Sequence, residues 1–118
     1  MSYTVTEAVP SFTEQPPNPS RVDERDDITL RWTYNIDGTF RNSVFSLSTG
    51  ETIALKDGSG LTVAPAFSDR VQVYISDSEA TLTLLHVNRS DDKEYLYRIQ
   101  NTALQATESV VNIFVQCK

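Results

Sequence analysis

The sequence predicts an all-β sandwich, because closely spaced turn signals separate short segments in which apolar and polar residues alternate. Turn signals recur along the chain at intervals of roughly 8 to 12 residues: Asp37-Gly38, Thr49-Gly50, Asp57-Gly58, Ser68-Asp69, Ser76-Asp77, the segment 88–92 and Asn101-Thr102. This spacing accommodates strands of about five to eight residues and leaves no room for helices of ordinary length.

The N-terminal segment, residues 1–21, is predicted to lie at a sheet edge. It contains Pro10, Pro16, Pro17 and Pro19, which lack a backbone donor and therefore disfavour a central strand. We place the sandwich core in residues 22–115.

Period-two alternation in that core region assigns one buried face to each strand. The last segment has two apolar faces, and we assign its odd-numbered residues to the core. The predicted inward residues are Ile28, Leu30, Trp32, Tyr34, Val71, Val73, Ile75, Leu82, Leu84, Val111, Ile113 and Val115.

Length and charge limit what the chain does. With 118 residues it has enough chain for one hydrophobic core, so we predict a single domain spanning residues 1–118. Sixteen acidic residues against ten basic ones give a net charge of −6. Nucleic-acid binding needs clustered Lys and Arg, so a nucleic-acid partner is not expected.

Candidate residues for catalysis or for a cofactor are few. The only histidine, His86, and the only cysteine, Cys117, do not form a nucleophile–base pair or a metal cluster. We therefore expect no enzymatic activity, no cofactor and no resident metal. The acidic run Asp23–Asp27 leaves a calcium site as an alternative, although its spacing differs from an EF-hand loop. Cys117 either pairs outside this chain or stays a free thiol.

The segment Ala80–Tyr97 carries the most specific signal. It resembles the E and F strands of an immunoglobulin variable-type domain, where a Leu-x-Leu strand leads to Asp-x-Gly/Ala-x-Tyr-x-Cys. On that match Asp91 is the family's aspartate, Tyr95 its corner tyrosine, and Tyr97 occupies the position of the second cysteine. The resemblance implies an immunoglobulin-like, variable-type antiparallel β-sandwich with Greek-key topology.

The B strand of that family resembles the segment from Ile28 to Trp32, with Trp32 at the position of the first cysteine. Phe45 then falls near the C-strand tryptophan. Loss of a disulfide usually costs about 2–5 kcal/mol, whereas burying a large aromatic side chain contributes up to roughly 4–6 kcal/mol. We therefore expect Trp32 to pack against Tyr97 in place of the disulfide.

A second family feature is an arginine that pairs with the aspartate before the F strand. Arg70 matches this arginine and Asp91 the aspartate. A bidentate contact between them would clamp one end of the sandwich. The alternative is two solvated charges, which contribute only about 0–1 kcal/mol.

Within the family, Leu30–Asn35 and Asp91–Tyr97 look like segments of the membrane-distal domain of hydroid allorecognition receptors. Those receptors bind matching copies on an opposing cell. The resemblance implies a single-pass receptor ectodomain on the extracellular face of the plasma membrane, with the same protein as partner and a weak homodimer in isolation. A heterophilic module that binds another protein or a glycan remains an alternative, as does a structural spacer.

Residue parity predicts the binding face. If Tyr95 and Tyr97 point inward, their neighbours on the same strand point outward, and Phe45 likewise places its neighbours outside. The alternative is a set of isolated surface apolar residues. The predicted binding residues are Val44, Ser46, Glu51, Glu94, Leu96, Arg98 and Phe114.

Asn88-Arg89-Ser90 is an Asn-X-Ser sequon at the predicted turn between the E-like and F-like strands. We expect Asn88 to be a glycosylation site of a secreted domain.

Overall fold

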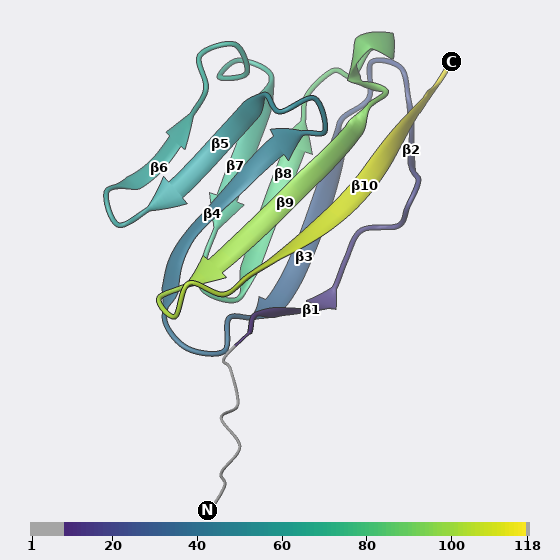
Figure 1. Cartoon of the computed structure of the whole chain (residues 1–118). Coiled ribbons are helices and arrows are strands. Elements are labelled where there is room, and N and C mark those ends of the chain that lie inside the picture. Colours follow the sequence, from purple (N-terminus) through teal and green to yellow (C-terminus); the bar gives the residue numbers. More distant parts are fainter. Residues whose placement is uncertain (1–8, 118) are drawn as a thin grey trace, which may run out of the picture.

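The structure is a computed structural model that describes residues 9–117. Residues 1–8, which begin the predicted N-terminal edge segment, and residue 118 lie outside the described residues. Two β-sheets pack face to face (Figure 1), which confirms the predicted all-β sandwich. We call the four-stranded sheet the back sheet and the six-stranded sheet the front sheet.

The back sheet has the order β1-β3-β8-β7 and the front sheet the order β2-β10-β9-β4-β5-β6. The back-sheet strands are β1 (Ser11–Glu14), β3 (Ile28–Asn35), β8 (Glu79–Leu84) and β7 (Val71–Ile75). The front-sheet strands are β2 (Ser20–Asp23), β10 (Ala106–Gln116), β9 (Glu94–Asn101), β4 (Phe40–Leu47), β5 (Thr52–Asp57) and β6 (Gly60–Val63). A short 3-10 turn, η1 (Arg89–Asp91), precedes β9.

The strand pairs are antiparallel, as predicted, with one exception. Strand β2 runs parallel to β10, with Ser20 opposite Ile113 and Val22 opposite Val115. The chain crosses from the back sheet to the front sheet between β1 and β2, where the prolines at positions 16, 17 and 19 lie. Both strands are sheet edges, the position expected for proline-rich segments.

The core follows the predicted alternation. All of the predicted inward residues belong to it except Ile28 and Val73, which are partly buried and pack against it. Val111, Ile113 and Val115 are buried, which confirms the choice between the two faces of the last strand.

An aromatic cluster joins the two sheets at the centre of this core. Trp32 extends from β3 and Tyr97 from β9, with ring centroids 5.3 Å apart. Phe45 of β4 stacks on Tyr97 at 4.4 Å and lies 5.4 Å from Trp32. Trp32 and Tyr97 have no exposed surface. The structure thus brings together two residues that stand where the family carries its inter-sheet disulfide.

The polar atoms of this cluster have hydrogen-bond partners, which offset the free-energy cost of removing these atoms from water. The indole Nε1 of Trp32 donates to the Ser109 hydroxyl at 2.8 Å, and that hydroxyl donates to Gln15 Oε1 at 2.6 Å. The Tyr97 hydroxyl lies 3.0 Å from the Tyr34 hydroxyl.

The N-terminal segment contributes more to the core than the sequence predicts. The Phe12 ring of β1 lies 6.0 Å from Tyr34 and 6.2 Å from Tyr97, centroid to centroid. The prolines correctly indicate edge strands. They do not indicate that a neighbouring side chain, Phe12, packs against the core. The packed sandwich therefore starts before residue 22.

A polar corner forms where β9 begins. Arg70 donates to Asp91 Oδ2 at 2.7 Å, and the Tyr95 hydroxyl donates to the Asp91 carbonyl at 2.8 Å. The same Oδ2 accepts the Asn88 backbone N–H at 2.9 Å. The arginine contact is therefore a single hydrogen bond rather than the expected bidentate one, and the oxygen that accepts it also accepts a backbone N–H.

Asn101 ties together two loops at the opposite end of β9. Its side chain is buried, its Nδ2 donates to the Ile36 and Asp37 carbonyls, and its Oδ1 accepts the backbone N–H groups of Ala103 and Gln105. One amide thus links the β3–β4 loop to the β9–β10 turn.

We predict that Trp32→Ala destabilises the domain by about 3–5 kcal/mol, because it removes the inter-sheet ring and leaves a cavity. That cost is comparable with the lower end of the stability of small domains, about 5–15 kcal/mol, so the variant should be at or near its unfolding midpoint at room temperature. Thermal unfolding followed by circular dichroism measures this. Tyr74→Ala is the control, since Tyr74 is 54% exposed. A cooperative Trp32→Ala melt close to wild type would contradict the role assigned to Trp32.

We also predict that stability falls at alkaline pH. Burial raises the pKa of Tyr97 to about 12 and also raises the pKa of Tyr34 and Tyr95. In the unfolded chain a tyrosine hydroxyl has a pKa of about 10. A higher pKa in the folded state contributes free energy of unfolding that is fully present below about pH 10 and is lost as the pH rises toward the folded-state pKa. The melting temperature should therefore fall between about pH 10 and 12, less steeply in Tyr95→Phe. A melting temperature independent of pH over that range would contradict the prediction.

Candidate binding face

The outer face of the front sheet is set by the buried residues beneath it. On β9 the side chains of Tyr95, Tyr97 and Ile99 are buried, so Leu96 and Arg98 between them point outward. On β4 the burial of Phe45 and its alternate neighbours likewise leaves Val44 facing outward. The strand register then determines which outward side chains are neighbours.

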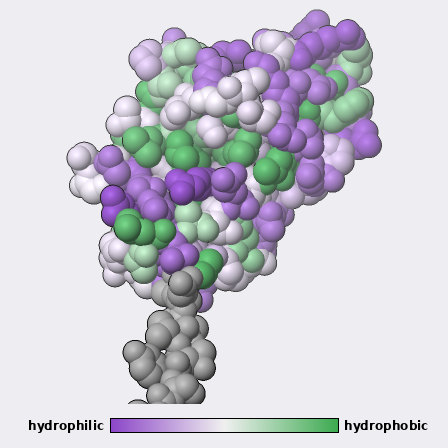
Figure 2. Space-filling view, viewed as in Figure 1, coloured by the Kyte–Doolittle hydropathy of each residue, from purple (hydrophilic) through white to green (hydrophobic). Residues whose placement is uncertain are grey.

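An apolar band crosses this face. We define it as Leu55, Val44, Leu96 and Val110, contributed by β5, β4, β9 and β10 respectively. Val44 lies opposite Leu55, and Leu96 lies opposite Val110. Val44 and Leu96 are diagonal neighbours on the paired strands β4 and β9, within reach of each other. Leu55 and Val110 are 39% and 40% exposed. Figure 2 shows apolar surface running across the middle of this face.

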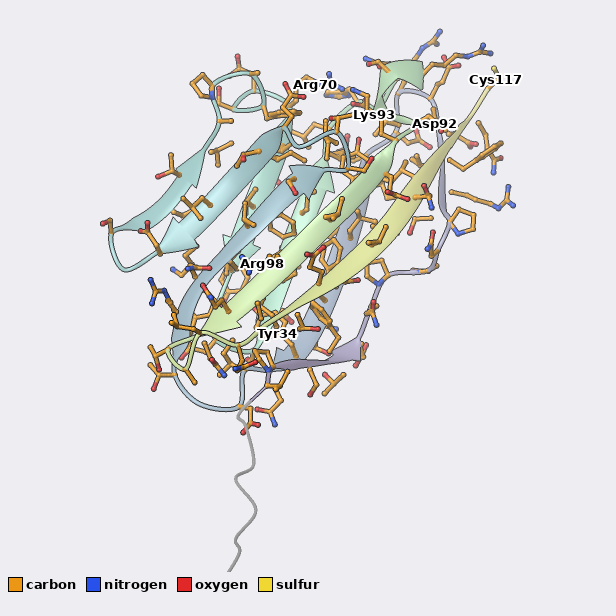
Figure 3. The ribbon with its side chains drawn as sticks, in the orientation of Figure 1. Tyr34, Arg70, Asp92, Lys93, Arg98 and Cys117 are labelled. Atoms are coloured by element: carbon orange, nitrogen blue, oxygen red, sulfur yellow. The ribbon has the colours of Figure 1, made fainter. Side chains whose placement is uncertain are left out.

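Charged and polar residues border the band. Arg98 lies opposite Glu108, and both are exposed. Glu94 lies opposite Asn112 on the other side of Leu96. Within residues 9–117 Arg98 forms no ion pair, and Figure 3 shows it midway along the front sheet. Among the described residues, the face therefore presents an apolar band with a cation outside any ion pair and carboxylates at its border.

The outer face of the back sheet differs in kind. The Thr29 and Thr83 hydroxyls are hydrogen-bonded across two strands at 2.8 Å, and Arg31 Nε donates to Glu79 at 2.8 Å. These polar groups already have partners within the domain. Within residues 9–117, the front sheet combines exposed apolar side chains with an arginine that forms no ion pair, whereas Arg31 of the back sheet is paired with Glu79, and this difference favours the front sheet as the binding face.

Most of the predicted binding residues lie together on this face, namely Val44, Ser46, Glu94, Leu96 and Arg98. Glu51 is exposed in the turn between β4 and β5.

Phe114 lies apart from the others. It is 45% exposed on β10, with Asn112 between it and Val110. The Arg21 guanidinium lies over its ring, 5.1 Å from the centroid. The structure therefore gives Phe114 a partner within the domain and does not join it to the band.

Two members of the band, Leu55 and Val110, are absent from the sequence-based set. Val110 alternates with the inward Val111, so parity indicates its outward position. Leu55 comes after two consecutive buried residues, Ile53 and Ala54. Two buried neighbours are possible there because the register between β4 and β5 shifts between Phe45 and Ser46. That shift hides the alternation of β5 in the sequence.

The acidic run from Asp23 to Asp27 is dispersed in the structure. Glu24 accepts a hydrogen bond from Arg89 at 3.1 Å, and Asp27 accepts the His86 backbone N–H at 2.9 Å. Residues 9–117 contain no group of three acidic, histidine or cysteine side chains placed to hold a metal ion. No helix in this range is long and apolar enough to cross a membrane.

Comparison with known proteins identifies the fold. No family model matches the sequence, and no curated protein matches it. A similar solved structure is the RIG-5 IG1 homodimer, with a TM-score of 0.71 over 92% of this chain and 99% of that chain. The chain has an immunoglobulin fold. Strands β5 and β6, which extend the front sheet beyond β4, make it variable-type.

The immunoglobulin fold alone does not assign a function. Sequence identity to the RIG-5 domain is 19%, and 858 chains of solved structures match. Since so many proteins share this fold, a function must be argued from the surface of this chain.

Proposed function

We propose that this domain is an extracellular recognition module that binds the same protein on an opposing cell, tethered to its own membrane in the full-length form. The observation that carries the proposal is the apolar band bordered by an unpaired arginine and several carboxylates. An apolar centre with a polar rim is the usual anatomy of a protein interface. The resemblance to hydroid allorecognition receptors supports the same reading.

Self-recognition requires a surface that is complementary to itself. In a two-fold dimer each copy presents the same patch, so a residue on one copy meets a different residue of that patch on the other. Arg98 then faces Glu94 or Glu51 of the partner subunit. Such pairs offset part of the repulsion between two molecules that each carry a net charge of −6. The structural similarity to a chain crystallised as a homodimer is consistent with this arrangement.

The band is small, so a single domain should associate weakly. Interfaces of low area are typical of transient encounters. Many receptors in one cell contact raise the effective affinity without any new contact in the individual interface. Weak association in solution and strong adhesion between surfaces therefore belong to the same proposal.

We predict that Leu96→Asp weakens self-association at least tenfold, because it places a charge in the middle of the band. Leu104→Asp is the matched control: Leu104 is 60% exposed in the β9–β10 turn, and its positive φ of 65° suits aspartate. Sedimentation velocity measures the dissociation constant. Equal weakening by both variants, or by neither, would place the interface elsewhere.

We predict that Arg98→Glu and Glu94→Arg each weaken self-association, since each sets like charges against one another. Mixing the two variants should restore binding, because each now supplies the charge that the other lacks. Glu51→Arg provides the same test for the second candidate acid. Failure of both mixtures to recover binding would contradict the proposed pairing.

Coated beads separate homophilic from heterophilic binding. Beads carrying this domain should cluster with one another, and beads carrying Leu96→Asp should remain dispersed. Wild-type beads that stay dispersed but bind to cells would instead support a receptor for a different protein or a glycan.

A further inference from the structure

The chain contains two segments of the form Asn-X-Ser, and they are not equivalent. Asn88-Arg89-Ser90 meets the requirement for N-glycosylation, whereas Asn18-Pro19-Ser20 has proline at the middle position, which blocks it. The two asparagines also differ in structure. Asn18 Oδ1 binds the backbone and side-chain N–H groups of Asn112, which joins the β1–β2 crossing to β10.

The side chain of Asn88 uses only its oxygen in the fold. Its Oδ1 accepts the Ser90 backbone N–H at 2.9 Å and the Ser90 hydroxyl. Among the hydrogen bonds of residues 9–117, none uses the Asn88 Nδ2, and the residue is exposed. A sugar on Nδ2 therefore breaks no contact and leaves the cap of η1 intact. We propose that Asn88 carries an N-linked glycan that covers the η1 end of the sandwich and leaves the apolar band open.

The position of η1 supports the second half of this proposal. Arg89, next to Asn88, donates to Glu24 at the end of β2 and contacts the Cys117 thiol just beyond β10. Figure 1 shows η1 at the end of the sandwich where β10 finishes. The apolar band crosses the middle of the front sheet. A glycan that starts from the η1 end thus projects from the tip of the domain rather than from its binding face.

The attachment is a group transfer from a lipid-diphosphate-linked oligosaccharide. Nδ2 of Asn88 forms a bond to the anomeric carbon of the first sugar, and the bond from that carbon to the donor's diphosphate breaks. The lipid diphosphate leaves with the electron pair of that bond, and one of the two Nδ2 protons passes to water. The contact between Asn88 and Ser90 spans only three residues, so it does not require the folded sandwich. The inference rests on the proposed function for the domain's passage through the secretory pathway, and its second half rests also on the proposed binding face.

The test is secretion of the full chain from eukaryotic cells behind a cleavable leader, followed by peptide mass spectrometry. We expect an oligosaccharide on the peptide containing Asn88 and none on the peptide containing Asn18. Peptide N-glycosidase should remove it and convert Asn88 to aspartate. Ser90→Thr should keep the glycan, whereas Ser90→Ala and Asn88→Gln should lose it. Secreted wild-type and Ser90→Thr proteins with unmodified Asn88 would overturn the assignment.

Self-association tests the position of the glycan. Sedimentation of the glycosylated protein before and after enzymatic deglycosylation should give the same dissociation constant within a factor of two. A tenfold gain in association on deglycosylation would show that the glycan covers the binding face and would overturn that half of the proposal. If neither form self-associates while Asn88 is modified, the homophilic function fails and the glycan assignment stands.

Discussion

The contact between Trp32 and Tyr97 is the constraint on which the rest of the structure depends. It joins the back sheet to the front sheet, and Phe45 stacks on the same ring from a neighbouring strand. Because β9 is held with Tyr97 inward, Leu96 and Arg98 must face outward. The packing of Tyr97 in the core thereby determines which side chains of β9 lie on the outer face of the front sheet. The hydrogen bond from Trp32 to Ser109 adds β10 to the same arrangement.

Much of this architecture is readable from the sequence, because it follows from local periodicity. Alternation identifies the inward side of β3 and β10, and the segment leading to Tyr95 identifies the corner where β9 begins. What the sequence does not reveal depends on pairing between distant strands. The parallel register of β2, the inward turn of Phe12 and the shift that exposes Leu55 each require knowledge of which strands are neighbours.

The two outer faces of the sandwich differ in how far their side chains are satisfied within the domain. Across the back sheet, hydroxyl pairs and the contact between Arg31 and Glu79 satisfy polar groups within the domain. Across the front sheet, by contrast, Leu55 and Val110 are exposed, and Arg98 forms no ion pair within residues 9–117. Residue parity assigns side chains to a face of the sheet. It does not tell whether the polar side chains of that face find hydrogen-bond or ion-pair partners within the domain. That distinction requires the side-chain contacts.

The amide of Asn101 has a consequence for how such a domain diversifies. Since its side chain bonds to backbone groups of both the β3–β4 loop and the β9–β10 turn, an insertion in either loop displaces the other. Variation in length at that tip is therefore constrained to occur in concert. Substitutions on the outer face of the front sheet carry no such linkage, so that face can change its side chains one at a time without displacing a loop.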